Sequence, residues 1–173
     1  IVLVAMSMLG LWALTAKAER PQGSQIKAER PELLTVLESL RSRGQYKILV
    51  ASLEETGLAE ELEKAANFTL FAPTDEAFAR VPKLAELLAD TEYLRQVLNR
   101  HLTLTDQIDS TVLVSLKELQ PREGKLLRIE TGEWIRINDA KVVEADVKAW
   151  NGAIHGINRV LMKDNDSWLR EIG

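Results

Sequence analysis

Cysteine is absent from this sequence and histidine occurs only twice, which removes several kinds of chemistry. Without cysteine the chain has no disulfide, no thiolate nucleophile and no thiolate ligand for a metal. The two histidines, His101 and His155, lie far apart, and neither has a histidine or carboxylate at the spacing of a recognisable metal motif. We therefore expect both histidines to be structural, and we expect no metal site.

Basic residues are fewer than acidic residues. The chain carries 22 lysines and arginines against 26 aspartates and glutamates, which gives a formal net charge of −4. Because non-specific nucleic-acid binding requires a basic surface, nucleic acid is not an expected partner. The sequence has no glycine-rich phosphate loop, nucleophile elbow or calcium loop, and no local signature pairs its acidic residues for glycoside hydrolysis. No motif therefore indicates an enzyme.

Aromatic residues are few, at 5% of the chain, whereas hydrophobic residues make up 46%. This imbalance predicts a core built from leucine, isoleucine, valine and alanine. A length of 173 residues suits one domain with a short appendage.

The N-terminal segment Ile1–Ala16 carries no charge, and Ala16 and Ala18 have the small side chains and spacing of a signal-peptidase site. Two interpretations of residues 1–18 remain open: a cleaved signal peptide, or a retained N-terminal membrane anchor. The uncharged segment is slightly shorter than a membrane span of about 20 residues. The chain begins without methionine or a basic region, so we expect further residues upstream. Residues 19–30 are polar and contain helix breakers, which predicts a linker.

The stretch Phe68–Phe78 predicts a buried strand that turns into a capped helix within one corner. Its first residues, Phe68–Phe71, are apolar or β-branched, as a buried strand requires. Pro73 lacks the N–H of a ladder bond and is expected to end the strand. Thr74 is a suitable helix N-cap, and Asp75 places negative charge in the first turn, where the helix dipole favours it.

Helical spacing of apolar residues predicts further helices on both sides of this corner. A first helix is expected to begin at Pro31, which suits a first helical turn, and to end at Gly44. Other helices are expected at about 46–55, 58–66, 76–80, 84–89 and 91–100.

The second half of the chain changes to the period of a strand. Strands are expected at 126–130, 134–138, 140–145, 153–157 and 160–162. Asn151–Gly152 predicts a type I′ hairpin turn, because both central positions of that turn need a positive φ. A helical half followed by a strand-rich half indicates the α+β class.

Three segments resemble the signature motifs of the fasciclin (FAS1) family. The first is Phe68–Phe78, and the second runs from Ile137 to Met162 and includes Asn151–Gly152. The third is the helix end that closes with His101, where the family usually has a Tyr-His pair and this chain has Arg100 for the tyrosine. The resemblance covers a domain at residues 31–163 and identifies the chain as a single-domain, bacterial-type member.

The resemblance implies a compact wedge of β-sandwich-like sheets with helices packed on one side. It also implies an extracytoplasmic adhesion or interaction module that carries no cofactor and is not an enzyme. The residues that match the family motifs, and that we expect to be structural, are Phe68, Phe71, Pro73, Thr74, Asp75, Phe78, His101, Asn151, Gly152 and His155.

In animal members of the family, integrin recognition is associated with the Tyr-His region and with an acidic–hydrophobic pair before the second block. The matching positions here are His101 and the pair Asp146–Val147. Because Arg100 replaces the tyrosine and the export signal is bacterial in type, we do not expect integrin binding. Asp146 and Val147 stay candidate contacts for another protein.

Two tryptophans are further candidate contacts. Trp150 precedes the predicted turn, where family members usually have a small polar residue. A large aromatic side chain at a hairpin tip either folds back onto the sheet or is exposed for contact. Trp168, in the C-terminal tail 164–173, presents the same two alternatives.

Two functional hypotheses follow. The first is a non-enzymatic, exported fasciclin-domain protein that makes protein–protein or adhesive contacts at the membrane surface, in one version as an accessory subunit of a larger membrane complex. The second is a soluble periplasmic or matrix module that binds a ligand or a carbohydrate. A retained anchor favours the first hypothesis, and a cleaved, monodisperse soluble protein favours the second.

Overall fold

The structure is a computed structural model, and it describes residues 33–162. The predictions for the signal peptide or anchor at 1–18, the linker at 19–30 and the tail at 164–173, including Trp168, lie outside the described residues.

Helices and strands follow one another in the order expected of the α+β class, and that prediction is confirmed. The helices are α2 Val36–Arg43, α3 Lys47–Glu55, α4 Leu58–Lys64, α5 Asp75–Ala79, α6 Leu84–Ala89, α7 Thr91–Arg100 and α8 Ser110–Leu113. The strands are β1 Phe68–Pro73, β2 Leu102–Thr103, β3 Glu118–Leu119, β4 Leu127–Glu130, β5 Arg136–Ile137, β6 Ala140–Lys148 and β7 Gly152–Ile157.

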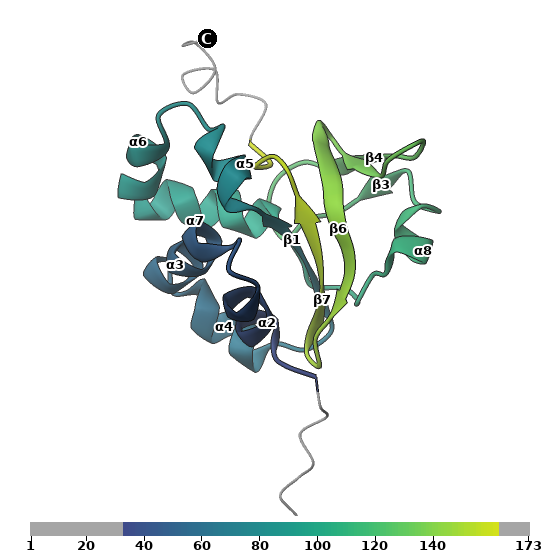
Figure 1. Ribbon diagram of the computed structural model, residues 1–173, viewed down its shortest axis with the longest axis horizontal. Helices are drawn as coiled ribbons and strands as arrows, with labels where there is room; N and C mark the ends of the chain where they lie inside the picture. Colours follow the sequence, from purple (N-terminus) through teal and green to yellow (C-terminus); the bar gives the residue numbers. More distant parts are fainter. Residues whose placement is uncertain (1–32, 163–173) are drawn as a thin grey trace, which may run out of the picture. The chain divides into compact units, whose positions relative to one another are not determined.

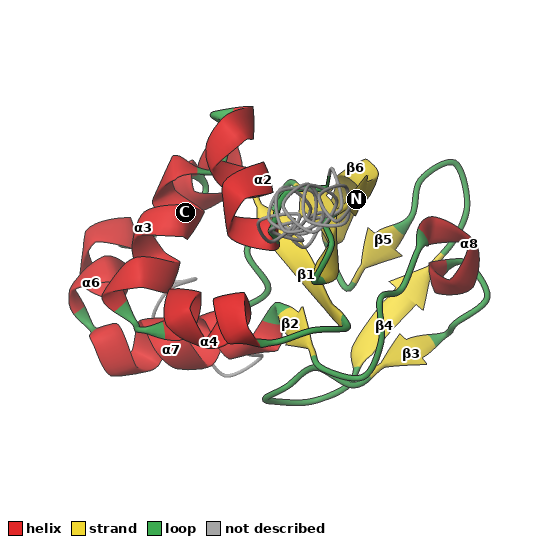
Figure 2. Ribbon diagram, turned by 90° about the horizontal axis from the view of Figure 1, so that it is seen from below, coloured by secondary structure: helices red, strands yellow, loops and turns green. Residues whose placement is uncertain are grey.

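The strands form one mixed sheet of seven strands in the order β2-β1-β7-β6-β5-β4-β3. Strands β1 and β7 are parallel, and every other neighbouring pair in this order is antiparallel. Helices α2 to α7 gather on one side of β1, β6 and β7, whereas α8 lies with β3 and β4 on the other side (Figures 1 and 2). The central strands therefore separate two apolar clusters.

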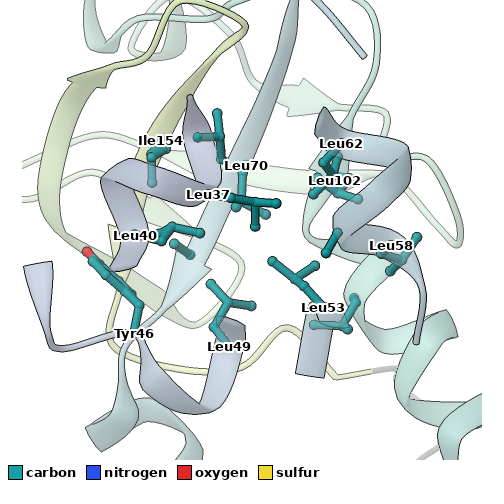
Figure 3. Packing of buried hydrophobic residues seen from close by; sticks show 14 of the residues in the cluster. Leu37, Leu40, Tyr46, Leu49, Leu53, Leu58, Leu62, Leu70, Leu102 and Ile154 are labelled. Atoms are coloured by element: carbon teal, nitrogen blue, oxygen red, sulfur yellow. The ribbon is translucent and has the colours of Figure 1, made fainter. Parts of the chain in front are cut away.

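The first cluster, the helix-side core, is mostly aliphatic, as the composition predicts. Leucines of α2, α3 and α4 meet Leu70 of β1, Leu102 of β2 and Ile154 of β7 (Figure 3). The second cluster, the strand-side core, lies between the central strands and β3–β5. It contains Phe71 and Ile157 from the central strands, and Leu119, Leu127 and Ile129 from the strands that face them. The sheet thus encloses this core as a sandwich does.

Strand β1 divides its side chains between the two cores because successive residues of a strand point to opposite faces. Phe68, Leu70 and Ala72 belong to the helix-side core. Phe71 is fully buried, but it belongs to the strand-side core. The sequence predicted the burial of Phe71, but the side chain packs on the face of the sheet opposite to the first helices.

Strand β1 ends at Pro73, as predicted, but Pro73 itself is still part of it. It is the last residue of β1 and is in register with Ile157 of β7. The N–H of Phe71 points away from β7 and donates to the carbonyl of His101 at 2.9 Å. The missing N–H of Pro73 would point the same way, because the direction alternates with a period of two. Strand β2 pairs only with Thr69 and Leu70, so no ladder bond is lost at Pro73.

Side chains cap the helices where the sequence carries capping residues. Helix α2 begins at Val36, after a capping box formed by Thr35 and Glu38, and ends at Gly44, which has a φ of 69°. It does not begin at Pro31, because Thr35 supplies the cap. The predicted N-cap Thr74 is confirmed, and its side chain accepts from the N–H of Ala77 at 3.2 Å.

Asp75 has a structural role that the sequence did not reveal. Besides standing in the first turn of α5, it accepts a hydrogen bond from the N–H of Ile48 at 2.8 Å. Helix α3 has no side-chain cap of its own at Tyr46. Asp75 thus satisfies one of the free N–H groups of α3 and fixes that helix to the corner after β1.

The hairpin between β6 and β7 turns one residue earlier than predicted. The N–H of Ala149 donates to the carbonyl of Gly152 at 2.9 Å, so Trp150 and Asn151 are the central residues of the turn. Neither Asn151 nor Gly152 is among the described residues with a positive φ, so the type I′ assignment was wrong. Gly152 is needed for space instead. A Cβ there would lie 2.8 Å from the carbonyl oxygen of Phe68 and 3.0 Å from Val36.

The other differences concern short elements. Residues 160–162 do not form the expected strand, since β7 ends at Ile157 and is the last described strand. Strands β2 and β3 and helix α8 were not predicted, because two to four residues carry no periodic signal.

Gly152→Ala tests the close approach of β7 to β1. The added methyl group meets backbone, which cannot rotate away, so we expect the free energy of unfolding to fall by about 1–3 kcal/mol. Gly132→Ala is the matched control, since nothing lies within 4 Å of the Cβ that it adds. Chemical denaturation of both variants measures the difference. Equal stability of the two variants would contradict the packing described for Gly152.

Candidate functional site

The residues of the two main family motifs meet along β1 and β7, which lie side by side in parallel register. Phe71 is paired with His155, and their rings stack with centroids 5.9 Å apart and planes at 25°. Phe68 is paired with Gly152 at the start of the same two strands. Phe78 and Asn151 are buried as well. The motif residues therefore build the interior of the fold.

Asn151 fixes the hairpin tip to the helices. Its Oδ1 accepts from the N–H of Val36 at 2.9 Å, and its Nδ2 donates to the carbonyl of Leu62 at 3.0 Å. The side chain is only 1% exposed. Both backbone groups lie at helix ends, where intrahelical partners are missing. The hairpin tip is therefore held rigidly against α2 and α4.

Trp150, next to this anchor, is exposed. Its backbone N–H donates to the carbonyl of Leu34 at 3.1 Å, so the residues before α2 lie along the hairpin tip. Of the two alternatives for this side chain, exposure is the one observed: Trp150 is 46% exposed, Leu34 46% and Leu33 47%. We refer to Leu33, Leu34 and Trp150 as the hairpin-tip patch.

Asp146 and Val147, predicted as a contact pair, point in different directions. Asp146 is exposed, has a φ of 59°, and accepts from the backbone N–H of Ser110 at 2.7 Å and from its hydroxyl. Partial burial alone would raise the pKa of Asp146, but the hydrogen bonds from Ser110 outweigh it and lower the pKa. Val147 is 7% exposed and belongs to the helix-side core. The Val147 side chain therefore contributes no contact surface.

Both ring nitrogens of His155 make structural hydrogen bonds to backbone groups. Its Nε2 donates to the carbonyl of Ile108 at 2.6 Å, and its Nδ1 accepts from the N–H of Asp146 at 3.3 Å. Thr69 lies on the same face of β1 as Phe71. Its hydroxyl donates to the carbonyl of Asp106 and accepts from the N–H of Ile108, both at 2.8 Å. These bonds fasten the segment before α8 to the central strands.

His101 is also structural and is fully buried. Its Nδ1 donates to the carbonyl of Val97 at 2.8 Å, and its Nε2 accepts from the N–H of Leu161 at 2.9 Å. The pKa of His101 is lowered to about 4, chiefly by burial and in part by the charge of Arg100, while the hydrogen bond to Val97 opposes part of the shift. The neutral imidazole thus joins the end of α7 to the segment after β7.

The hydrogen bonds of both histidines go to backbone groups, so neither ring has a free nitrogen for proton transfer. Within residues 33–162, no group of three or more histidine, cysteine or acidic residues could hold a metal ion. In the same range no helix is long and apolar enough to cross a membrane.

Sequence reasoning missed two features of the structure. The role of Leu34 beside Trp150 carries no local signal, because it depends on a contact between residues far apart in the chain. Arg100 was noticed only as a departure from the family's Tyr-His pair, but it is 3% exposed and therefore a buried cation. Helical spacing places position 100 off the apolar stripe of Leu94, Val97 and Leu98, so no local signal marked its burial.

These features define an α+β domain whose motif residues hold a parallel strand pair between two cores. The family model described as the fasciclin domain matches residues 44–163, and the chain belongs to this family. A solved structure of a FAS1 domain pair from the insect cell adhesion molecule fasciclin I has the same fold. Its TM-score is 0.66 at 23% identity, over 77% of this chain and 52% of that one.

The relatives include animal and bacterial proteins. The chain is 34% identical over 136 residues to the pig transforming growth factor-beta-induced protein ig-h3, covering 76% of this chain and 20% of that protein. It is 29% identical over 129 residues to an uncharacterised protein of Synechocystis, covering 73% of this chain and 96% of that protein. The chain thus spans about a fifth of the length of ig-h3 and nearly all of the bacterial relative.

The pKa of His101 predicts a specific pH dependence. The unfolded chain protonates this group near its ordinary pKa of 6.5 and the folded chain only near 4, so the unfolded state binds more protons between these values. The contribution of neutral His101 to the free energy of unfolding is fully present above pH 6.5. It falls by about 3 kcal/mol as the pH drops to 4. His101→Gln, which cannot titrate, should be less stable at pH 7 and lose less stability over this range.

Urea denaturation of both proteins between pH 7 and pH 4 measures this difference. All other ionisable groups are common to the two proteins, so their contributions cancel in the comparison. Parallel pH profiles would contradict the buried neutral state of His101.

Proposed function

We propose that this protein is a non-enzymatic, extracytoplasmic interaction module that contacts a protein partner through the hairpin-tip patch. The observation that carries this proposal is the exposure of Trp150 on a hairpin tip that Asn151 holds in place. An aromatic side chain on a rigid support loses little conformational entropy on binding, which suits a binding hot spot.

Burial of the Trp150 ring against a partner would release more free energy than leaving the ring in water. Burying a tryptophan removes on the order of 150–250 Å² from water. At roughly 25 cal/mol per Å² this burial is worth a few kcal/mol, of which an exposed ring gains only part. The neighbouring leucines, Leu33 and Leu34, extend the apolar surface beside the ring. A partner that covers the patch would gain most of this energy.

Our proposal for the location is the membrane surface. Residues 1–18 are the proposed signal peptide or anchor, and residues 19–30 the proposed linker. A linker of that length reaches at most about 40 Å. If the anchor is retained, the domain therefore stays close to the membrane. In that case we propose that the protein is an accessory subunit of a membrane complex. The chain enters the described domain at Leu33, within the hairpin-tip patch.

A second candidate function is a soluble module that binds a small ligand or a carbohydrate. A cavity of about 910 Å³, lined by residues of the α5–α6 connection, α7 and the strands β3 and β4, favours it. A cleaved and monodisperse soluble protein would favour this alternative over the membrane complex.

Trp150→Ser tests the hairpin-tip patch. Because the ring is exposed, thermal stability should change by less than about 0.5 kcal/mol. Binding to the partner that co-purifies from native membranes should weaken by about 2 kcal/mol, as expected for an aromatic hot spot. The matched control is Trp134→Ser, since Trp134 is 48% exposed but lies in the β4–β5 connection, where Lys141 covers its ring.

Quantitative pull-down with the purified partner compares these two variants. If both variants lose binding equally, the cause is general surface hydrophobicity and not the hairpin-tip patch. Unchanged binding in Trp150→Ser would overturn the proposed contact. Early unfolding of Trp150→Ser would assign the ring to the core.

The proposed anchor has its own test. Intact-mass analysis of the native protein should show residues 1–18 present, and alkaline carbonate should leave the protein in the membrane pellet. A mature N-terminus at Glu19 in a fully soluble protein would remove the anchor and leave the soluble interaction module.

A further inference from the structure

Arg100 is a buried cation that pairs with no carboxylate of the described residues. It is the last residue of α7 and is 3% exposed. Its Nε has no hydrogen-bond partner, and among residues 33–162 no carboxylate lies within 4.0 Å of its guanidinium nitrogens. The side chain runs against the loop before β4, where Nη1 lies 2.7 Å from the position that a Cβ of Gly124 would occupy. Gly124 leaves room for this guanidinium.

Arg100 lies at the wall of the cavity of about 910 Å³. Four more basic side chains line the same cavity and are exposed around it: Arg80, Lys125, Arg128 and Arg159. They come from three separate parts of the chain. This basic cluster stands out in a protein whose net charge is −4.

The acidic side chains of the described residues do not pair with the buried guanidinium. Three of them line the cavity: Glu118, Glu130 and Asp139. All three are exposed, and Asp139 is bound by Arg159 at 3.3 Å. Among the described residues of the lining, Arg100 is thus the one buried charge, and basic groups outnumber acidic ones.

An unpaired buried charge is unfavourable because the interior solvates it poorly. An anion in the cavity would relieve this cost, and its bonds to a guanidinium would be charge-assisted and short. The planar guanidinium suits two oxygens of one phosphate, sulfate or carboxylate group. The described residues that line the cavity include no aromatic side chain on which a sugar ring would stack.

We propose that the cavity around Arg100 is a binding site for an oxyanion, in which Arg100 forms the floor and Arg80 and Arg128 form the rim. The ligand class is a molecule that carries a phosphate, sulfate or carboxylate group. A cavity of about 910 Å³ is larger than such a group alone, so the oxyanion belongs to a larger molecule or chain segment.

Thermal unfolding of the full chain in inorganic phosphate or sulfate tests this site, with ionic strength held constant by sodium chloride. An anion at ten times its dissociation constant should raise Tm by about 4 °C. In Arg100→Gln the anion affinity should fall at least about tenfold, the loss expected for a charge-assisted hydrogen bond. Without added anion this variant should be no less stable than the wild type, because it removes an unpaired charge.

Two further variants serve as controls. Arg41→Gln makes the same charge change at an exposed arginine that pairs with Glu54 at 2.6 Å, and it should keep the full response to anions. Arg80→Gln changes only the exposed rim and should lower the affinity without affecting the fold, so it keeps the test valid if Arg100→Gln does not fold.

The oxyanion has two sources that the experiment separates: a free ligand, or the carboxylates of Asp164 and Asp166 in the same chain. If the chain supplies it, the wild type should not respond to phosphate or sulfate, whereas the double variant Asp164→Asn, Asp166→Asn should respond. Absence of a response in both proteins would overturn the site. An equal response in Arg100→Gln and the wild type would overturn it as well.

Discussion

The parallel pairing of β1 with β7 is the interaction on which the rest of the structure depends. It joins Phe68–Pro73 to Gly152–Ile157, two segments separated by most of the domain. Because each strand is buried on both faces, the pair carries side chains of the helix-side core and of the strand-side core at once. Such long-range parallel contacts require the intervening chain to be ordered, and the polar anchors around the pair provide that order.

These anchors are hydrogen bonds from buried side chains to backbone groups. Asn151 fixes the hairpin tip to two helices, His101 joins α7 to the segment after β7, and His155 holds the segment before α8. Each would leave a buried donor or acceptor unsatisfied if it were removed. The motif residues are therefore committed to the fold, and the groups available for binding are those that the anchors position: Trp150 on the rigid hairpin and Arg100 at the end of α7.

Local sequence signals predicted much of this fold. The Thr74 cap, the helix 91–100 with its buried Leu94, Val97 and Leu98, and the burial of Phe68 and Phe71 all follow from residues near one another in the chain. Features that depend on distant contacts were not predictable in this way. Gly152 was expected to supply a positive φ, but its role is set by the carbonyl of Phe68. Val147 was expected at a surface, but a β-bulge next to Asp146 turns it into the helix-side core.

Native-state hydrogen exchange tests the central claim most directly, because it reports the free energy needed to open each backbone hydrogen bond. The account predicts that the amides between β1 and β7 exchange only through global unfolding, and that Asn151→Ala lowers their protection by the full loss of stability. Amides of the short strand β5 and of α8 should exchange through smaller, local openings. Protection of β1 and β7 no greater than that of α8 would contradict the claim that this strand pair holds the domain together.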